Sequence, residues 1–311
     1  MTPRRDGSES GFLRMIVFCG YANSDLTVHV PSLPGAGDRV QACGIQRYDG
    51  GMAANAAASA ARMGADARFA GVVGPDPLST AFLAQLGADG VNTEWACRDG
   101  HLTTAVILVT PDGERSVISE DDDLTEERLA RVLTLLSDAG GGRLYLDGYR
   151  FPWAAAPLAQ APGLRTVVDL DGCESAEGAR AALSVAEHVI LGRARAERLL
   201  GPDAGAAAVA HGTHVLVTDG ARGWRLHTPE GEEHTGAALD VTARDATGAG
   251  DCFTGSYLAE LERGARPDEA ARFASVAAGL SVTREGARAR LPGRAEVAAH
   301  LARAGAGLPR G

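Results

Sequence analysis

Aromatic residues, cysteine pairs and long apolar runs are all scarce in this 311-residue sequence. Only 5% of the residues are aromatic while 45% are hydrophobic, so we expect a core built from small aliphatic side chains. The five cysteines form no CxxC pair, which suggests neither a zinc ribbon nor a disulfide framework and favours a reducing, cytoplasmic setting. No stretch approaches the ~18 apolar residues that a membrane helix needs, so we expect no membrane partner.

The sequence also has fewer basic residues (30 Lys and Arg) than acidic ones (40 Asp and Glu). The formal net charge is −10, which argues against a nucleic-acid groove and an anionic membrane surface and favours a small-molecule partner. The length suits one large α/β domain. Residues 1–14 are polar and charged without the apolar run of a signal peptide, so we expect a flexible tail there and the folded domain over 15–311.

Two kinds of strand pattern indicate two sheets. A buried strand near the start of the domain is expected to deliver a polar loop, Asn23 to Asp25, at its carboxyl end, where open α/β sheets place ligand groups. Segments 26–50 and 97–120 have shorter, mixed β patterns, and we expect them to form a small lid outside the main sheet. From about residue 124 helix-like and strand-like segments alternate, which predicts parallel βαβ units.

The stretch RDATGAGDCFTGSYLAEL, residues 244–261, places a flexible turn directly before a helix-like pattern. Gly248, Ala249 and Gly250 leave the backbone N–H groups of a helix N-terminus accessible, which makes a cradle for an anion. The sequence has no GxxxxGK[ST] motif, and this glycine pair lacks the third glycine of a dinucleotide fingerprint, so a P-loop NTPase and a nicotinamide enzyme are disfavoured. Asp251 would take the proton from an attacking alcohol, and the helix dipole should keep its carboxylate ionised. The alternative is a plain glycine-rich turn in which Asp251 only stabilises the helix.

A family resemblance starts from this motif. DATGAGDCFTG closely resembles the C-terminal signature of the PfkB, or ribokinase-like, carbohydrate kinases, and YDGGMAANAAASAARMGA with FAGVVGPD resembles their N-terminal signature. The resemblance runs from residue 15 to about residue 292, and FASVAAGLSVTREGARARLP is especially similar to sulfofructose and ketose kinases of the family. It implies a three-layer α/β/α core with a mainly parallel central sheet, a small β-sheet lid, and ATP-dependent phosphorylation of a sugar-like hydroxyl. It also implies that Asp251 is the catalytic base and that the backbone of 248–250 is the anion hole.

The resemblance implies which residues hold the substrate. The matching positions are Asn23, Asp25, Gly50, Gly51, Asn55 and Asp147. An Asp can accept two hydrogen bonds from adjacent sugar hydroxyls, and a Gly-Gly pair lets a ligand touch the backbone, so the residue types agree with this chemistry. The alternatives are a solvent-facing helix amide for Asn55 and a plain turn residue for Asp25.

Nucleotide and cation positions follow from the same resemblance. The positions expected along the phosphates, ribose and adenine of ATP are Thr218, Gly220, Gly223, Ser275 and Gly279. Asp245 and Thr247 match the first part of a monovalent-cation site near the anion hole, whereas Arg290 falls at or near a position that is often Ser. A guanidinium from Arg288 or Arg290 is therefore expected to make activation by potassium weak or absent.

One motif of the family is missing. Its N-x-x-E positions correspond here to Gly192 and Arg195. An Arg can neutralise phosphate charge but cannot ligate a cation, so Mg²⁺ would be held mainly through nucleotide phosphates and waters. Glu197 lies close by, although the register does not favour it as a substitute.

Clues to the substrate point in opposite directions. The acidic run SEDDDL would present Glu120 or Asp121 to the hydroxyls of a neutral polyol. The alternative is that this run is only a solvated face. Arg150, by contrast, would suit a substrate with a phosphate or sulfonate tail. We expect a sugar or ketose kinase that uses ATP and Mg²⁺. The alternatives are a nucleoside kinase, with Tyr48 and Phe69 as the surface for the base, and a non-catalytic nucleotide- or sugar-sensing protein. A lid with exposed edges also suggests a homodimer through the lid.

Overall fold

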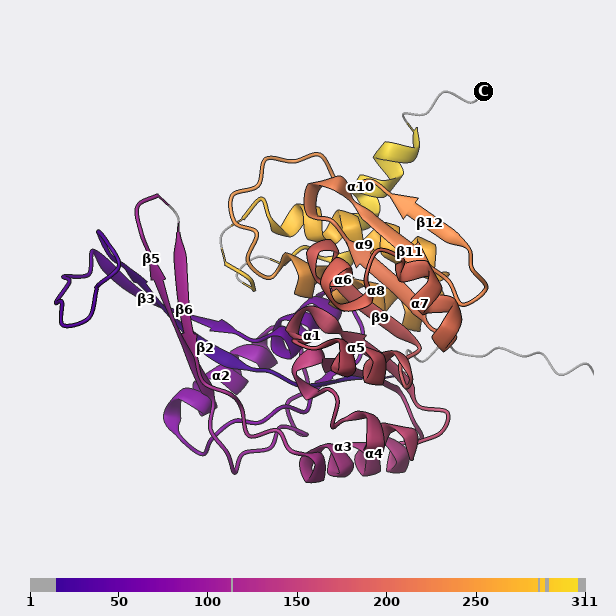
Figure 1. Ribbon diagram of the computed structural model, residues 1–311, viewed down its shortest axis with the longest axis horizontal. Helices are drawn as coiled ribbons and strands as arrows, with labels where there is room; N and C mark the ends of the chain where they lie inside the picture. Colours follow the sequence, from indigo (N-terminus) through magenta and orange to yellow (C-terminus); the bar gives the residue numbers. More distant parts are fainter. Residues whose placement is uncertain (1–14, 113, 285, 289–290, 307–311) are drawn as a thin grey trace, which may run out of the picture.

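The computed structural model describes residues 15–112, 114–284, 286–288 and 291–306. The expected tail, 1–14, and Arg290 lie outside these ranges. Figure 1 shows a layered body of helices and strands from which a small sheet projects at one side. None of the described helices is long and apolar enough to pass through a lipid bilayer.

The main sheet lies at the centre of the body. Within the described residues it has eight strands in the order β12-β11-β10-β9-β8-β7-β1-β4, parallel from β4 to β10 and antiparallel at β11 and β12. The strands are β1 (Ile16–Cys19), β4 (Ala67–Phe69), β7 (Arg143–Asp147), β8 (Arg165–Asp169), β9 (His188–Gly192), β10 (His214–Thr218), β11 (Trp224–His227) and β12 (Glu233–Gly236). The predicted α/β class with a mainly parallel central sheet is confirmed.

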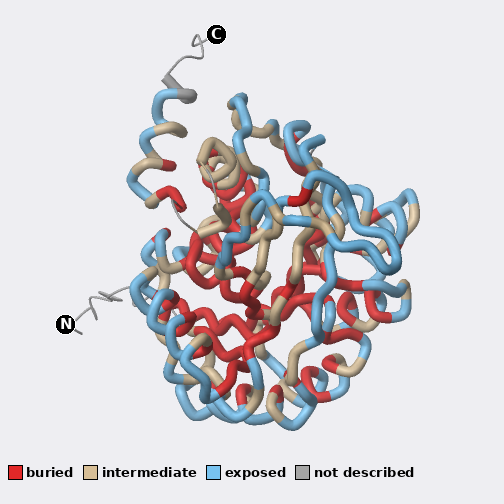
Figure 2. Tube along the Cα trace, turned by 90° about the vertical axis from the view of Figure 1, so that its left-hand side faces the viewer, coloured by how far each residue is buried: buried red, intermediate tan, exposed pale blue. Residues whose placement is uncertain are grey.

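Helices cover both faces of the main sheet, as the predicted three-layer core requires. Alternate residues of β1 serve two separate cores, with Ile16 and Phe18 in one and Val17 and Cys19 in the other. The helices on the first face are α1 (Met52–Arg62), α2 (Pro77–Ala88), α8 (Ala249–Glu262), α9 (Pro267–Ser281) and α10 (Arg294–Ala306). Those on the second are α3 (Glu126–Asp138), α4 (Ala155–Ala159), α5 (Ala176–Leu183), α6 (Arg193–Leu200) and α7 (Ala204–His211). Figure 2 shows the buried residues gathered between these layers.

The projecting sheet, which we call the lid sheet, pairs four strands of the described chain in the order β3-β2-β5-β6. They are β2 (Asn23–His29), β3 (Gly44–Gly50), β5 (Thr103–Val109) and β6 (Arg115–Ser119). The expectation that Asn23 to Asp25 form a loop is wrong, because these residues begin β2 and pair at once with both β3 and β5. This pairing sets Asn23 opposite Gly50 at the point where the lid sheet joins the body.

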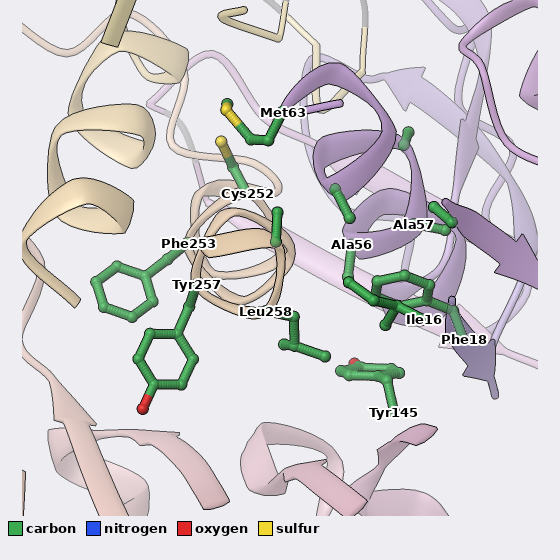
Figure 3. Close-up of a cluster of buried hydrophobic side chains, with 14 of the residues drawn as sticks. Ile16, Phe18, Ala56, Ala57, Met63, Tyr145, Cys252, Phe253, Tyr257 and Leu258 are labelled. Carbon is green, nitrogen blue, oxygen red and sulfur yellow. The ribbon is translucent and has the colours of Figure 1, made fainter. Parts of the chain in front are cut away.

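Close packing of α1 against α8 positions the site. A Cβ on Gly255 of α8 would collide with the carbonyl oxygen of Ala56 in α1, so the two helices touch through their backbones. Figure 3 shows Ala56 and Ala57 of α1 on one side of α8, and Phe253 and Tyr257 of α8 packed within the core on its other side. As expected from the composition, small side chains make this contact possible. The approach also brings the first turn of α8 next to α1.

Candidate active site

The first turn of α8 has the form of the predicted anion cradle. Gly248 caps the helix in the left-handed region, with φ +73°, and a Cβ there would lie 2.7 Å from the Cβ of Ala287. A Cβ on Gly250 would meet no other atom within 4 Å, so the space beside this glycine is open. The first-turn N–H groups of a helix carry the positive end of its dipole. The turn therefore has the room and the polarity to receive a phosphoryl group.

Asp251 lies in the same turn and is half-buried. Its Oδ2 accepts a hydrogen bond of 2.8 Å from Nδ2 of Asn55. Burial raises the pKa of Asp251 to about 7, against the hydrogen bond from Asn55, which lowers it, and with the charges of Asp171 and Asp147, which raise it. Contrary to the expectation, the helix dipole therefore does not keep this carboxylate fully ionised near neutral pH, because loss of solvation raises its pKa to about the pH of the solution. A carboxylate that titrates near pH 7 is a stronger base than an ordinary Asp.

Residues of β2, β3 and α1 meet where the lid sheet joins the body, and Asn55 connects them to Asp251. We call this group the acceptor cluster: Asn23, Asp25, Gly50, Asn55 and Asp251. Nδ2 of Asn23 donates a hydrogen bond of 2.8 Å to Oδ1 of Asp25. A Cβ on Gly50 would lie 2.5 Å from Oδ1 of Asn23 and from Oδ2 of Asp25, so a side chain would not fit beside them. Asn55 is 6% exposed and faces Asp251, so it is not the solvent-facing amide of the alternative reading.

Two buried acceptor atoms of the acceptor cluster have no partner. They are Oδ1 of Asn23 and Oδ1 of Asn55, which make no hydrogen bond within the described chain. Gly51, with φ +99°, turns the chain from β3, which pairs with Asn23, into α1, which carries Asn55. The carbonyl of Gly51 accepts a hydrogen bond of 2.9 Å from the N–H of Asn55. Buried acceptors are costly unless water or a ligand satisfies them. The cluster therefore offers hydrogen-bond acceptors to a molecule that carries hydroxyl donors.

Asp147 is placed differently from the expectation. It is 0% exposed, and its two carboxylate oxygens accept hydrogen bonds from Nε of Arg150 at 2.9 Å and from the N–H of Tyr21 at 2.6 Å. Arg150 also donates two hydrogen bonds, of 2.6 and 3.0 Å, to Asp122. This geometry speaks against a substrate contact by Asp147, because protein groups already occupy its carboxylate. It likewise leaves Arg150, with its side chain 3% exposed, unavailable to a phosphate or sulfonate tail.

The other acidic residues singled out from the sequence lie on the surface. Glu197 pairs with Arg193 at 2.9 Å, and both side chains are more than half exposed. Glu120 and Asp121 are exposed as well. Sequence reasoning missed Asp122, whose side chain is buried although it belongs to the same acidic run. Only its ion pair with Arg150, in the short 3-10 helix η1 (Gly148–Arg150) after β7, distinguishes it from a solvated charge.

Beside the cradle lies an apolar hollow of about 240 Å³, which we call the nucleotide hollow. All the nucleotide positions expected from the sequence line it, together with two cradle residues: Thr218, Gly220, Gly223, Ser275, Gly279, Ala249 and Gly250. Leu239 and Val241 supply part of the apolar wall. Because Gly250 lines the hollow and also belongs to the cradle, a ligand in the hollow reaches the first turn of α8 directly.

The expected cation residues, Asp245 and Thr247, lie next to the cradle, and both carboxylate oxygens of Asp245 accept backbone hydrogen bonds. Asp245 accepts the N–H of Thr247 through Oδ1 and the N–H of Gly286 through Oδ2, each at 2.9 Å. Arg288 does not lie here, because its Nη2 is 3.0 Å from Oδ2 of Asp49 in the lid sheet. No three His, Cys, Asp or Glu side chains of the described ranges group as metal ligands.

The positions of the missing N-x-x-E motif hold no metal ligand. Nη1 of Arg195 donates to a backbone carbonyl at 2.6 Å, and the N–H of Gly192 donates to Oδ1 of Asp171 at 2.8 Å. The charge of Asp171 raises the pKa of Asp251, so this carboxylate lies near the candidate base. Sequence reasoning missed Asp171, because the run VVDLDG carries no signature that separates its two acids.

Comparisons with known proteins agree with this geometry. The model of the pfkB family carbohydrate kinases matches residues 13–294. The chain is 26% identical to the ribokinase of Bacillus subtilis (strain 168) over 303 residues, which cover 92% of this chain and 98% of that protein. It is 29% identical to the fructokinase of Vibrio alginolyticus over 286 residues, which cover 81% and 91%. The solved structure of Arabidopsis thaliana ribokinase complexed with ribose and ATP matches it with a TM-score of 0.80 at 23% identity, over 93% of this chain and 99% of that one.

Proposed function

The chain belongs to the pfkB family of carbohydrate kinases, which are phosphotransferases that act on hydroxyl groups, and we propose that it transfers the γ-phosphoryl group of ATP to a hydroxyl of a sugar or ketose-like molecule. One observation carries this proposal. Gly250 lines the nucleotide hollow, and the next residue, Asp251, belongs to the acceptor cluster. A phosphoryl donor and a hydroxyl acceptor bound in these two places meet at the first turn of α8.

Each side of the first turn has its own task in the proposed reaction. Asp25 and Asn23 hold substrate hydroxyls, and Asp251 takes the proton of the hydroxyl that attacks the phosphorus. The backbone N–H groups at 248–250 stabilise the charge on the transferred group. Because the transition state of phosphoryl transfer is loose, the proton moves late, and a base with a pKa of about 7 is strong enough.

Mg²⁺ is expected to arrive with ATP. When bound, it neutralises charge on the phosphate oxygens. Gly192 and Arg195 offer it no ligand, so nucleotide phosphates and waters would hold most of its coordination sphere. Asp171, whose charge acts on Asp251, is the nearby carboxylate that we propose would help to hold the ion on the protein side.

The direct test is to incubate the protein with ATP and Mg²⁺ against D-ribose, D-fructose, other ketoses and nucleosides, and to look for phosphorylated product by mass. A sugar phosphate that depends on Asp251 supports the proposal. Product from nucleosides alone would instead favour the nucleoside kinase. Binding of ADP without any phosphorylated product would favour the sensing protein.

The nucleoside alternative has less support than the sugar kinase. Phe69 is 0% exposed in the core, so it cannot stack on a base. Tyr48 is 46% exposed on the lid sheet, and its hydroxyl donates to Gln46 at 2.7 Å. Neither residue supplies the enclosed apolar surface that a nucleobase needs.

The lid sheet supports a proposed homodimer. Its two edge strands, β3 and β6, carry large apolar side chains that are mostly exposed, with Ile45 62%, Val117 59% and Ile118 66% accessible. Unpaired edges with such residues favour self-association. Light scattering coupled to size-exclusion chromatography is expected to report a dimer, and Ile118→Lys is expected to shift it toward the monomer. A monomer in the unaltered protein would contradict this proposal.

A further inference from the structure

Arg288 joins the two halves of the site. It follows Ala287, whose Cβ would lie 2.7 Å from a Cβ on Gly248 of the cradle. Its guanidinium reaches across to Asp49 of β3, where Nη2 lies 3.0 Å from Oδ2, and it stacks 5.0 Å above the ring of Phe82. The charge of Asp25, in the acceptor cluster, also acts on this guanidinium. Arg288 therefore extends from the phosphate side to the acceptor side.

The guanidinium is buried but not satisfied. The side chain of Arg288 is 6% exposed, yet neither Nη1 nor Nη2 makes a hydrogen bond to a described residue. The ion pair with Asp49 supplies charge but not the alignment that a hydrogen bond requires. The other charged groups that act on Arg288 are Asp89 and Asp25. The guanidinium therefore contacts one carboxylate and lies within range of two more, while its two terminal nitrogens make no hydrogen bond in the described part of the chain.

The unsatisfied atoms around the acceptor cluster are complementary. Arg288 offers donors, whereas Asn23 and Asn55 each offer a buried acceptor without a partner. A hydroxyl group donates one hydrogen bond and accepts others, so adjacent hydroxyls can satisfy both kinds of atom at once. A carboxylate or phosphate on the substrate would satisfy only the donors. It would also add negative charge beside Asp25 and Asp251.

We propose that Arg288 is a substrate-contacting specificity residue, which donates hydrogen bonds to hydroxyl oxygens of a neutral polyol and, being already charge-paired with Asp49, does not select anionic sugars. This inference rests on the proposed kinase function. It explains why a guanidinium can stand among three carboxylates without attracting an anion, since those carboxylates already balance its charge. It also gives the acceptor side a donor, which the cluster itself supplies only through amide N–H groups.

The test compares Arg288→Gln, Arg288→Lys and the control Arg284→Gln with the unaltered protein. Arg284 lies on the same segment but pairs with Glu296 at 2.8 Å, toward α10. The substrates are D-ribose with D-ribonate and D-fructose with 2-keto-D-gluconate, since each pair differs by a carboxylate and keeps the terminal hydroxyl. A urea-unfolding midpoint for every variant separates misfolding from loss of contact.

We expect the unaltered enzyme to prefer the neutral member of each pair. Arg288→Gln should raise KM for the sugar by about 10- to 100-fold with little change in KM for ATP, because a buried charged donor is lost. Arg288→Lys should recover part of the loss, and Arg284→Gln should match the unaltered enzyme. An unchanged sugar KM in Arg288→Gln, an equal rise in both KM values, or a preference for the carboxylates would overturn the inference.

Calorimetry separates this inference from the kinase proposal. If no sugar is phosphorylated, the kinase proposal fails, and titration of D-ribose and D-fructose into the ADP-bound protein then decides the role of Arg288. Binding that is lost in Arg288→Gln and kept in Arg284→Gln supports the contact. Equal binding by all variants, or no binding of either sugar, contradicts it.

Discussion

The nucleotide side and the acceptor side of the site are built from opposite kinds of residue. The nucleotide hollow is lined mostly by Gly, Ala, Val and Leu, and the polar groups that it offers to the proposed phosphate are backbone N–H groups in the first turn of α8. The acceptor cluster consists of carboxylates and amides, several of them buried, with unsatisfied atoms. The shape of the hollow and backbone dipoles are enough to bind the proposed nucleotide. Recognition of the hydroxyl groups of a sugar instead needs polar side chains. Changes on the two sides should therefore have separable effects.

The largest expected effect is on the acceptor side. Asp251→Asn should lower kcat by about three orders of magnitude, because the amide cannot accept the hydroxyl proton. Steady-state kinetics with the sugar that the unaltered enzyme phosphorylates measures this. Full activity in the variant would show that Asp251 is not the base.

A second change tests whether the acceptor side rests on a buried ionic network. Arg150→Gln leaves Asp147 and Asp122 buried without their cation and should lower the free energy of unfolding by about 3–5 kcal/mol. Urea unfolding followed by circular dichroism measures it. The matched change on the nucleotide side, Arg193→Gln, breaks exposed pairs and should leave the midpoint unchanged. Equal shifts of the unfolding midpoint in the two variants would contradict the expected difference between buried and exposed ion pairs.

The cradle is tested by filling its open space. A Cβ on Gly250 would meet no other atom within 4 Å, so we expect Gly250→Val to fold while its side chain blocks the phosphoryl position and lowers kcat/KM for ATP by about 100-fold. Gly87→Val is the control, since a Cβ on this remote glycine of α2 also has open space. Unimpaired turnover in Gly250→Val would place the phosphate elsewhere.

The pH profile tests the electrostatics of the candidate base. Because Asp251 must lose its proton, kcat/KM should rise with pH through about 7 in the unaltered enzyme. Asp171→Asn removes a negative charge near Asp251 and so makes loss of its proton easier. We expect the rising limb of the pH profile of kcat/KM to move to lower pH by roughly half a unit. A limb that stays in place or moves upward would show that the charge of Asp171 does not act on Asp251.

The smallest expected effect concerns potassium. Replacing K⁺ by Na⁺ should change turnover by less than about twofold, since both oxygens of Asp245 are bonded to backbone N–H groups. Initial rates at constant ionic strength measure this. Strong dependence on K⁺ would mean that a cation competes successfully for Asp245.

The sequence allowed the nucleotide side to be predicted more fully than the acceptor side. The cradle at 248–251 depends on local helix geometry, and the residues around Gly220 and Gly279 line one hollow as expected. Asp147 could not be placed, because its partner Arg150 also binds Asp122, 28 residues away in the chain. The sequence shows which side chains carry charge, but only the fold determines which of them become buried together.

The raised pKa of the candidate base shows the same limit. The position of Asp251 in the first turn of a helix is visible in the sequence and predicts an ionised carboxylate. Its burial beside Asn55 depends on the backbone contact between α1 and α8, at Gly255, which no local pattern announces. Long-range packing therefore sets the chemistry of a residue whose location is set locally.

The most direct test of the two-sided site measures nucleotide binding and turnover together in the two central variants. Titration calorimetry gives Kd for ADP, and the coupled kinase reaction gives kcat. We predict that Asp251→Asn binds ADP within about twofold of the unaltered protein while losing about three orders of magnitude in kcat, and that Gly250→Val loses ADP affinity while still binding the sugar. Loss of ADP affinity in Asp251→Asn in proportion to its loss of rate would contradict the separation of the two sides.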